Sequence, residues 1–202
     1  MRLIFVGPQG SGKGTQADII SKKLKIAHIS TGDLLRNISG GLKEEVDSYI
    51  DHGNLVPDDL ILRILNERII EKDCDEGFIL DGFPRNLVQA KELDNIMDVD
   101  EVIEIDVSDK ESVKRISGRR GCVSCGAIFN VETSPRPITP GVCDRCGGDL
   151  TQRKDDNETA LKKRLETYHK ETKKILSHYK SVKVNGEQDI EKVTEDILKI
   201  LK

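Results

Sequence analysis

The sequence lacks tryptophan, and aromatic residues of all kinds make up only 3% of its 202 residues. It has no excess of positive charge, because its formal net charge is −4 at pH 7. It therefore lacks the overall basic character that favours nucleic acid or an anionic membrane. No apolar run approaches the length of a membrane span, and the opening run 3–6 is too short for a signal peptide. We therefore expect a cytoplasmic protein.

The composition is that of a globular chain, with 34% charged and 36% hydrophobic residues. Its length allows one sizeable core and a small insertion. Apolar segments alternate along the chain with helical patterns, which predicts an α/β fold with a parallel sheet flanked by helices. Strands are expected near residues 3–6, 26–29, 77–81, 101–106 and 182–184. Helices are expected near 13–24, from 34, and near 42–51, 61–69, 86–93, 109–120, 161–179 and 190–201.

The first sixteen residues, MRLIFVGPQGSGKGTQ, contain the strongest chemical signal. A fully apolar run leads into a glycine-rich turn, and a helix is expected to start near Lys13. Glycines allow successive backbone N–H groups to face one concavity, and the helix N-terminus and the lysine add positive charge. The pattern departs from the strict P-loop, because Gly14 follows the lysine and the hydroxyl comes at Thr15. This combination nevertheless predicts a phosphate site. Its residues are Gly10, Ser11, Gly12, Lys13, Gly14 and Thr15.

Four of the five cysteines form two C-x-x-C pairs, with seventeen residues between the pairs. In a chain without an export signal, such spacing favours a metal over disulfides. The four ligands would be Cys122, Cys125, Cys143 and Cys146. Four thiolates suit a tetrahedral structural Zn²⁺, although iron can also occupy such a site. The fifth cysteine, Cys74, is expected to be a lone thiol without a role.

Six motifs occur in a characteristic order: GPQGSGKGTQ, STGDLLR, GNLVPDD, DGFPRN, GRRGCVSCG and RKDDNETALKKRL. Together they resemble the adenylate kinases, in the long form whose lid binds a structural metal ion. The resemblance implies a P-loop core with a five-stranded parallel sheet, formed by residues 1–29, 60–117 and 156–202. It also implies a monophosphate-binding arm at 30–59 and a zinc-ribbon-like lid at 118–155. The implied reaction moves the γ-phosphoryl group of ATP to AMP, with Mg²⁺, in a monomer.

The resemblance also assigns residues to the two nucleotides. For ATP it adds Arg115, Arg119, Ile128, Phe129 and Gln188 to the phosphate loop. For AMP it assigns Thr31, Arg36, Asn54, Leu55, Val56, Gly82, Phe83, Pro84, Arg85, Gln89, Arg153 and Arg164. The amide of Gln89 suits an adenine edge, because it can donate one hydrogen bond and accept another.

Catalysis is then expected from charge, because phosphoryl transfer spreads negative charge over oxygens and needs no protein nucleophile. The expected catalytic residues are Lys13, Asp81, Arg85, Arg119, Arg153 and Arg164. Asp81, at the end of an apolar strand, would hold Mg²⁺ through water. We expect Arg115 and Arg119 to share one helix face, and Arg153 and Arg164 to share another.

The sequence also gives expectations for several other positions. Asp155 and Asp156 are expected to pair with lid arginines or to clasp the lid to the core. Gln9 stands where relatives usually carry proline. The glutamine is expected to loosen the phosphate loop and so to lower the rate. The ring of Phe129 would keep an apolar surface toward ATP. The four histidines have no ligand spacing and are interpreted as structural or solvated.

Three alternatives remain. A kinase for another nucleoside monophosphate would share most motifs, although Thr31 and Gln89 favour adenine. A zinc-ribbon nucleic-acid binder is disfavoured, because the insertion has a modest mix of charges and Phe129 as its only aromatic residue. A P-loop hydrolase would not need the second phosphate clamp that Arg36 and Arg85 offer. We therefore expect nucleotides as partners, without nucleic acid or membrane.

Overall fold

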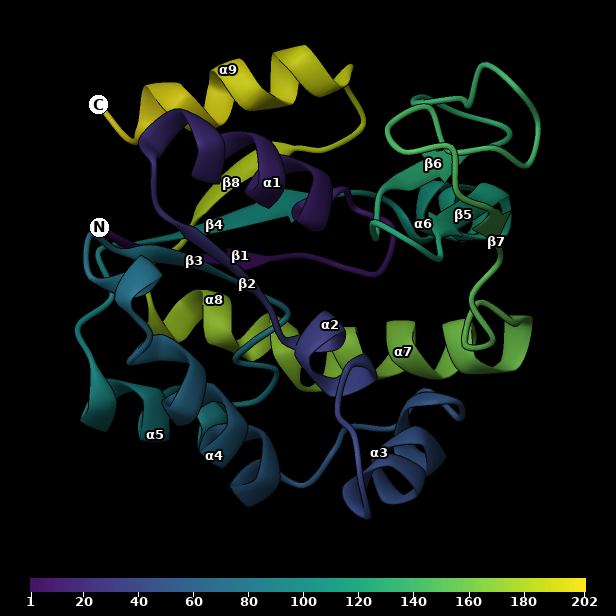
Figure 1. The fold of residues 1–202 in the computed structure, drawn as a ribbon. Helices are drawn as coiled ribbons and strands as arrows, with labels where there is room; N and C mark the ends of the chain where they lie inside the picture. Colours follow the sequence, from purple (N-terminus) through teal and green to yellow (C-terminus); the bar gives the residue numbers. More distant parts are fainter.

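The computed structural model describes residues 1–202 and has a five-stranded parallel sheet at its centre (Figure 1). The strand order is β2-β3-β1-β4-β8, and each of the four pairings is parallel. The strands are β1 (Arg2–Val6), β2 (Ala27–Ser30), β3 (Phe78–Asp81), β4 (Glu101–Asp106) and β8 (Val182–Asn185). The predicted α/β class and its five parallel strands are confirmed.

The apolar opening run forms the central strand because it is buried on both faces. Leu3 and Phe5 contact one hydrophobic cluster, whereas Ile4 and Val6 contact the other. The first cluster contains residues of α1 (Lys13–Leu24) and α9 (Ile190–Ile200), which cover one face of the sheet (Figure 1). Strand β1 therefore holds the glycine-rich loop 7–12, here called the phosphate loop after its predicted ligand, at the carboxyl edge of the sheet, where parallel α/β folds bind ligands.

The second face of the sheet is covered by a larger group of helices (Figure 1). They are α2 (Thr31–Arg36), α4 (Asp58–Ile69), α5 (Leu87–Ile96), α7 (Glu158–Lys170) and α8 (Ile175–His178), and α3 (Leu42–Ile50) packs against α2 farther from the sheet (Figure 1). Two short 3₁₀ turns, η1 (Lys72–Cys74) and η2 (Thr172–Lys174), complete this layer. None of the helices is both long enough and apolar enough to cross a membrane.

Residues 118–155, here called the cysteine module, form a separate three-stranded antiparallel sheet (Figure 1). Its strands are β5 (Arg119–Cys122), β6 (Ile128–Asn130) and β7 (Leu150–Thr151), in the order β6-β5-β7. Its core holds only five buried residues, Cys122, Ala127, Phe129, Cys143 and Leu150. Because two of these are cysteines, the module depends on its sulfur cluster for much of its interior.

The helix leading into the module is shorter than predicted. Helix α6 (Asp109–Gly118) ends at Gly118, so Arg119 is the first residue of β5 and does not share a helix face with Arg115. The cause is a contact with a distant residue, because Asn130 of β6 lies where a Cβ on Gly118 would be and its Nδ2 donates to the Arg115 carbonyl at 2.7 Å. The carbonyl of Gly118 accepts a hydrogen bond from Val131 N, so the chain turns into the module there.

The prediction of one long helix over 161–179 was also wrong, because the structure divides this segment into three elements. Helix α7 ends at Lys170, and η2 and α8 follow in its place. The Thr172 hydroxyl donates to the carbonyl of Arg85 at 2.7 Å, which ties this break to the site. Arg153 precedes α7, whose N-cap is Asn157, so Arg153 and Arg164 do not lie on one helix face as expected.

Candidate functional site

The phosphate loop connects β1 to α1, and its glycines allow it to pack closely. Gly10 has φ +78°, and a Cβ there would lie 2.9 Å from the Ser112 carbonyl oxygen of α6. Gly12 is the N-cap of α1 in a left-handed conformation, so the helix begins at Lys13 as predicted. The loop thus directs the unpaired N–H groups of a helix N-terminus toward the carboxyl edge of the sheet.

Lys13 carries the positive charge of the loop. Its Nζ donates to the carbonyls of Gly7 at 2.7 Å and Pro8 at 2.9 Å. Burial lowers the pKa of Lys13 to about 8, against the attraction of Asp81 and with further repulsion from Arg85 and Arg119. Lys13 is thus a buried cation near other cations, an environment that favours a bound anion.

Asp81 ends β3 as predicted, next to the start of α1. Its Oδ2 lies 3.1 Å from the place that a Cβ on Gly14 would take. The Nε2 of His28 lies 3.6 Å from the same oxygen and has no hydrogen-bond partner, although it is buried. His28 was expected to be merely structural or solvated, and its place beside Asp81 follows from the parallel register of β2 and β3.

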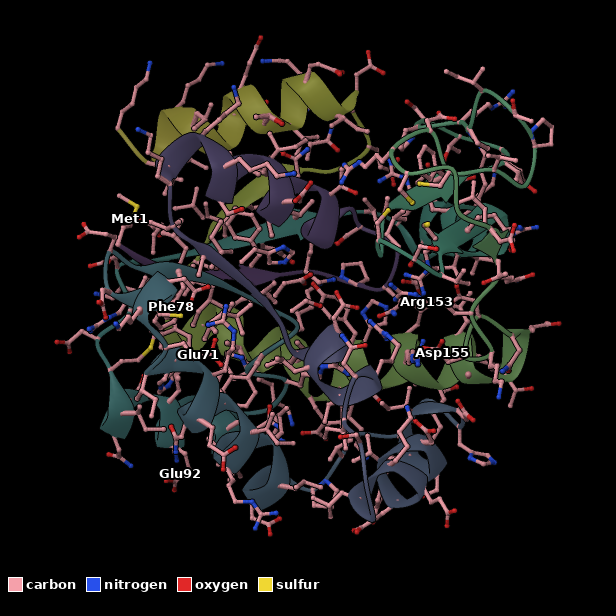
Figure 2. The ribbon with its side chains drawn as sticks, viewed as in Figure 1. Met1, Glu71, Phe78, Glu92, Arg153 and Asp155 are labelled. Carbon is pink, nitrogen blue, oxygen red and sulfur yellow. The ribbon has the colours of Figure 1, made fainter.

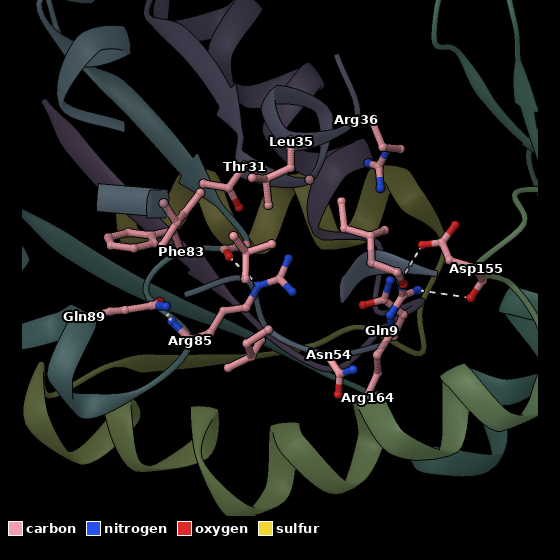
Figure 3. Close-up of a pocket in the computed structure, with 16 residues that line it drawn as sticks. Gln9, Thr31, Leu35, Arg36, Asn54, Phe83, Arg85, Gln89, Asp155 and Arg164 are labelled. Carbon is pink, nitrogen blue, oxygen red and sulfur yellow. Dashed lines mark hydrogen bonds and ion pairs between the residues drawn. The ribbon is translucent and has the colours of Figure 1, made fainter. Parts of the chain in front are cut away.

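A pocket lies between α2, α3, α4 and the loop after β3 (Figure 3). Ten of the twelve residues expected to bind AMP line it: Thr31, Arg36, Asn54, Leu55, Val56, Gly82, Phe83, Arg85, Gln89 and Arg164. Pro84 and Arg153 do not. Gln9, Asp155 and Ile61 also line the pocket. The structure therefore brings together motifs that are more than one hundred residues apart in sequence.

Three arginines, Arg36, Arg85 and Arg164, place positive charge in this pocket. The Nε of Arg85 donates to the Gly82 carbonyl at 2.7 Å, which leaves both Nη groups free of protein partners. Burial, together with the nearby charge of Arg164, lowers the pKa of Arg85 to about 10. Arg36, at the end of α2, is paired with Asp33 at 2.6 Å. The pocket therefore suits a small anionic molecule.

The amide of Gln89 is buried and already has two partners. Its Oε1 accepts from the backbone N–H of Arg85 at 2.7 Å (Figure 3), and its Nε2 donates to Asp58 at 2.7 Å. Asp58, the first residue of α4, also accepts from Asn86, the N-cap of α5. Sequence reasoning missed Asp58, since nothing in the pattern distinguishes it from the adjacent Asp59.

Two aspartates hold the arginines at the junction between the cysteine module and the core. Arg119 donates to both oxygens of Asp156, and Arg164 pairs with Asp155 (Figure 3). Arg164 also donates to the Ile50 carbonyl of α3 at 3.1 Å. The expected pairing of these aspartates with arginines is confirmed.

Arg153 lies at the same junction, near Asp155 (Figure 2). Its Nη2 is 3.8 Å from Asp33. Burial, together with the neighbouring charges of Arg36 and Arg119, lowers its pKa to about 10. Thus Arg153, although outside the pocket wall, belongs to the same group of mutually repelling cations.

Of the residues expected beside ATP, Arg115 adjoins the phosphate loop, because its Nη1 lies 3.5 Å from the Ser11 carbonyl oxygen, whereas the others are more dispersed. Arg115 pairs with Glu111 and donates to Gly186 at 2.9 Å, while Gln188 donates to Asn185. Ile128 is half-buried, but Phe129 is 6% exposed in the core of the cysteine module. Because successive strand residues face opposite sides, the ring of Phe129 fills the module interior, and its expected apolar contact with ATP stays a prediction.

Gln9 is attached to the core through its backbone. Its carbonyl accepts a hydrogen bond from the Ser112 hydroxyl of α6, and its side chain lines the pocket. The other histidines are paired near the surface: His52 with Ser48, His169 with Asp109 and His178 with Asp94.

The four paired cysteines converge and could hold a metal ion. All four sulfurs lie within 4.8 Å of one another, with Cys122–Cys146 at 3.5 Å and Cys125–Cys143 at 3.6 Å. A tetrahedral ion with metal–sulfur bonds of about 2.3 Å needs sulfurs about 3.8 Å apart, so the cluster fits. Hydrogen bonding to the Cys125 and Ser124 backbones lowers the pKa of Cys122 to about 6, despite burial.

Comparison with known proteins agrees with this geometry. The family model described as "Adenylate kinase" matches residues 5–184. An adenylate kinase of Caldicellulosiruptor bescii is 45% identical over 213 aligned positions, covering 100% of this chain and 99% of the relative. One from Methanocella arvoryzae is 45% identical over 98% of this chain and 96% of the relative, and one from Thermosipho africanus is 44% identical over the whole of both chains. The chain belongs to the adenylate kinase family.

Proposed function

We propose that this protein transfers the γ-phosphoryl group of ATP to AMP and so forms two ADP. The observation that carries the proposal is the convergence of cations between the phosphate loop and the pocket. Burial and mutual repulsion lower the pKa values of Lys13, Arg85 and Arg153 together. Such a site is short of negative charge and stabilises oxygen atoms on which charge develops during the reaction.

The two nucleotides occupy opposite sides of this charge. ATP places its phosphates on the N-terminus of α1 and Lys13, while AMP enters the pocket with its phosphate toward Arg85 and Arg36. Asp81 and the hydroxyl of Thr15 suit a Mg²⁺ ion bound with ATP, which would neutralise charge on its phosphates. The acceptor phosphate attacks directly, so the protein's work is to position both nucleotides and to stabilise charge.

Closure of the arm (30–59) and the lid (118–155) over the core (1–29, 60–117 and 156–202) completes the site. Arg119, Arg153 and Arg164 lie at the junction of these parts, where Asp155 and Asp156 orient two of them. Closure excludes water, which would otherwise accept the phosphoryl group. We place Arg115, Ile128 and Gln188 around ATP on the lid side, and propose that the protein acts as a monomer.

The cysteine cluster has a structural role in this proposal. Four thiolates fill the coordination sphere of Zn²⁺ and leave no position for a substrate. The five-residue interior of the module is too small to order it alone. The ion therefore maintains the lid that carries Arg119 and Arg153.

The test is an initial-rate assay with ATP, Mg²⁺ and one acceptor at a time, chosen from AMP, GMP, CMP and UMP. We expect activity with AMP to exceed that with the other acceptors by at least about tenfold, because a hydrogen-bonding pocket rejects mismatched bases. Preference for a pyrimidine monophosphate would retain the phosphoryl transfer but overturn AMP as the acceptor.

A further inference from the structure

We infer that Asp58 is a positioning residue that sets base selectivity by fixing the orientation of the Gln89 amide. The inference rests on the proposed function and deepens it. Gln89 is 2% exposed, lines the acceptor pocket and has a polar partner on each side of its amide. Asp58 is only half-buried and does not line the pocket, so it acts through Gln89.

The chemistry of the two partners permits only one amide orientation. A backbone N–H can only donate, so the amide atom facing Arg85 N is the oxygen. An ionised carboxylate can only accept, so the atom facing Asp58 is the nitrogen. A flipped amide would face a donor with a donor and an acceptor with an acceptor. Both contacts are 2.7 Å long, so each would strongly oppose the flip.

Asp58 is itself held in place. Its Oδ1 accepts from the Asn86 Nδ2 at 3.1 Å as well as from Gln89. Asn86 is the N-cap of α5, and its Oδ1 accepts from the backbone N–H of Gln89 at 2.8 Å. The starts of α4 and α5 are thus joined by one hydrogen-bond network, with the Gln89 side chain at its end.

The fixed amide distinguishes two purines that differ by one functional group. After its two protein contacts, Gln89 retains one N–H donor and one oxygen lone pair. The six-membered edge of adenine offers an acceptor at N1 and a donor at N6, which match this pair. Hypoxanthine offers a donor at N1 and an acceptor at O6, which match only the flipped amide. A site with fixed polar groups therefore prefers AMP over IMP.

The experiment compares Asp58→Leu, Asp58→Asn and the control Asp59→Asn. Leucine has similar volume but no acceptor, whereas asparagine can retain an acceptor oxygen at the Oδ1 position. Asp59 is an exposed neighbour in the same first helical turn, so its change controls for lost charge at the α4 N-terminus. For each variant, kcat and KM are measured with AMP and with IMP, and KM is measured for ATP.

We expect Asp58→Leu to lower the ratio of kcat/KM for AMP over IMP by about tenfold or more, with KM for ATP unchanged. Asp58→Asn should keep the ratio within about threefold of wild type, and Asp59→Asn should not change it. The inference would be overturned by an unchanged AMP-to-IMP ratio of kcat/KM in Asp58→Leu, which includes the case in which kcat/KM falls by the same factor with both acceptors. Should thermal melting show that Asp58→Leu is unfolded, Asp58→Ser provides the same test, because its hydroxyl is too short to reach Gln89.

Calorimetric binding of AMP and IMP separates this inference from the proposed function. An inactive wild-type protein would refute the proposed reaction. The binding preference for AMP over IMP, and its loss in Asp58→Leu, would still report the amide orientation. Equal binding of AMP and IMP by the wild-type protein would refute the inference even where transfer to AMP is fast.

Discussion

Replacing Lys13 by methionine separates the stability of the fold from its chemistry. Methionine keeps most of the length of the lysine stem but removes the ammonium group, which donates to Gly7 and Pro8 and faces Arg85 and Arg119. If the site is built to receive phosphates, this charge is unfavourable in the free protein and essential in the reaction. The substitution should therefore abolish activity without weakening the fold.

The stability effect follows from the lowered pKa of Lys13. One pKa unit corresponds to about 1.4 kcal/mol, so a fall from 10.5 to about 8 corresponds to at most about 3.5 kcal/mol of destabilisation by the charged form. The two hydrogen bonds to carbonyls offset part of this, at about 1 kcal/mol each. At pH 7 the free energies of unfolding of Lys13→Met and wild type should therefore agree within about 1.5 kcal/mol.

The pH dependence has a definite sign. Below pH 8 Lys13 is protonated in both the folded and the unfolded chain, so the penalty is fully present. Between pH 8 and 10.5 the unfolded chain binds more protons at this lysine, so its contribution to folding stability rises with pH. Between pH 7 and pH 9.5, wild type should gain about 2 kcal/mol relative to Lys13→Met.

The loss of activity should be much larger than any change in stability. Removing one preorganised charge from a developing oxyanion costs about 10² to 10³ in kcat. Urea unfolding at both pH values and a coupled assay of ADP formation measure the two effects on the same preparations. Turnover within tenfold of wild type would refute the role of Lys13, and a variant several kcal/mol less stable at pH 7 would show that the ammonium serves the fold instead.

Three further substitutions test other parts of the account. Arg85→Met should raise KM for AMP and lower kcat by about 10² or more, with KM for ATP unchanged, and steady-state kinetics would refute this if only the ATP parameters moved. Cys143→Ser should lower the bound metal and expose the cysteine module to proteolysis while the core still melts cooperatively, and unchanged metal content and melting would contradict the structural role. Gly118→Ala should destabilise the fold by about 1–3 kcal/mol, because its Cβ would overlap Asn130, and an unaltered melting temperature would contradict the close approach.

Local sequence patterns were sufficient for most of the fold. Fully apolar runs bounded by glycine predicted the buried strands, and Lys13 to Leu24 was found as a helix with its predicted ends. The elements that differed are governed by distant contacts. The early end of α6 depends on Asn130, and the break after Lys170 is accompanied by a hydrogen bond to the Arg85 carbonyl. The periodicity of 109–120 does not reveal the contact of Gly118 with Asn130, and that of 161–179 does not reveal the hydrogen bond to the Arg85 carbonyl.

The candidate site was recovered better by its ordered motifs than by periodicity. The pocket contains most residues that the resemblance assigned to AMP, but the relation between Arg115 and Arg119 was wrong because it assumed one continuous helix. The burial of Phe129 depends on which face of β6 meets the sulfur cluster, which the sequence of the strand does not specify. Asp58 was missed because its role arises only where α4 and α5 meet.

The most direct test of the central claim is the product balance of one reaction. Radiolabelled AMP, unlabelled ATP and Mg²⁺ are incubated with the protein, and nucleotides and inorganic phosphate are separated over time. The account predicts that one ATP and one AMP are consumed for every two ADP formed, that the label passes into ADP, and that little phosphate is released. Release of phosphate from ATP while the label stays in AMP would show that water is the acceptor and would contradict the account.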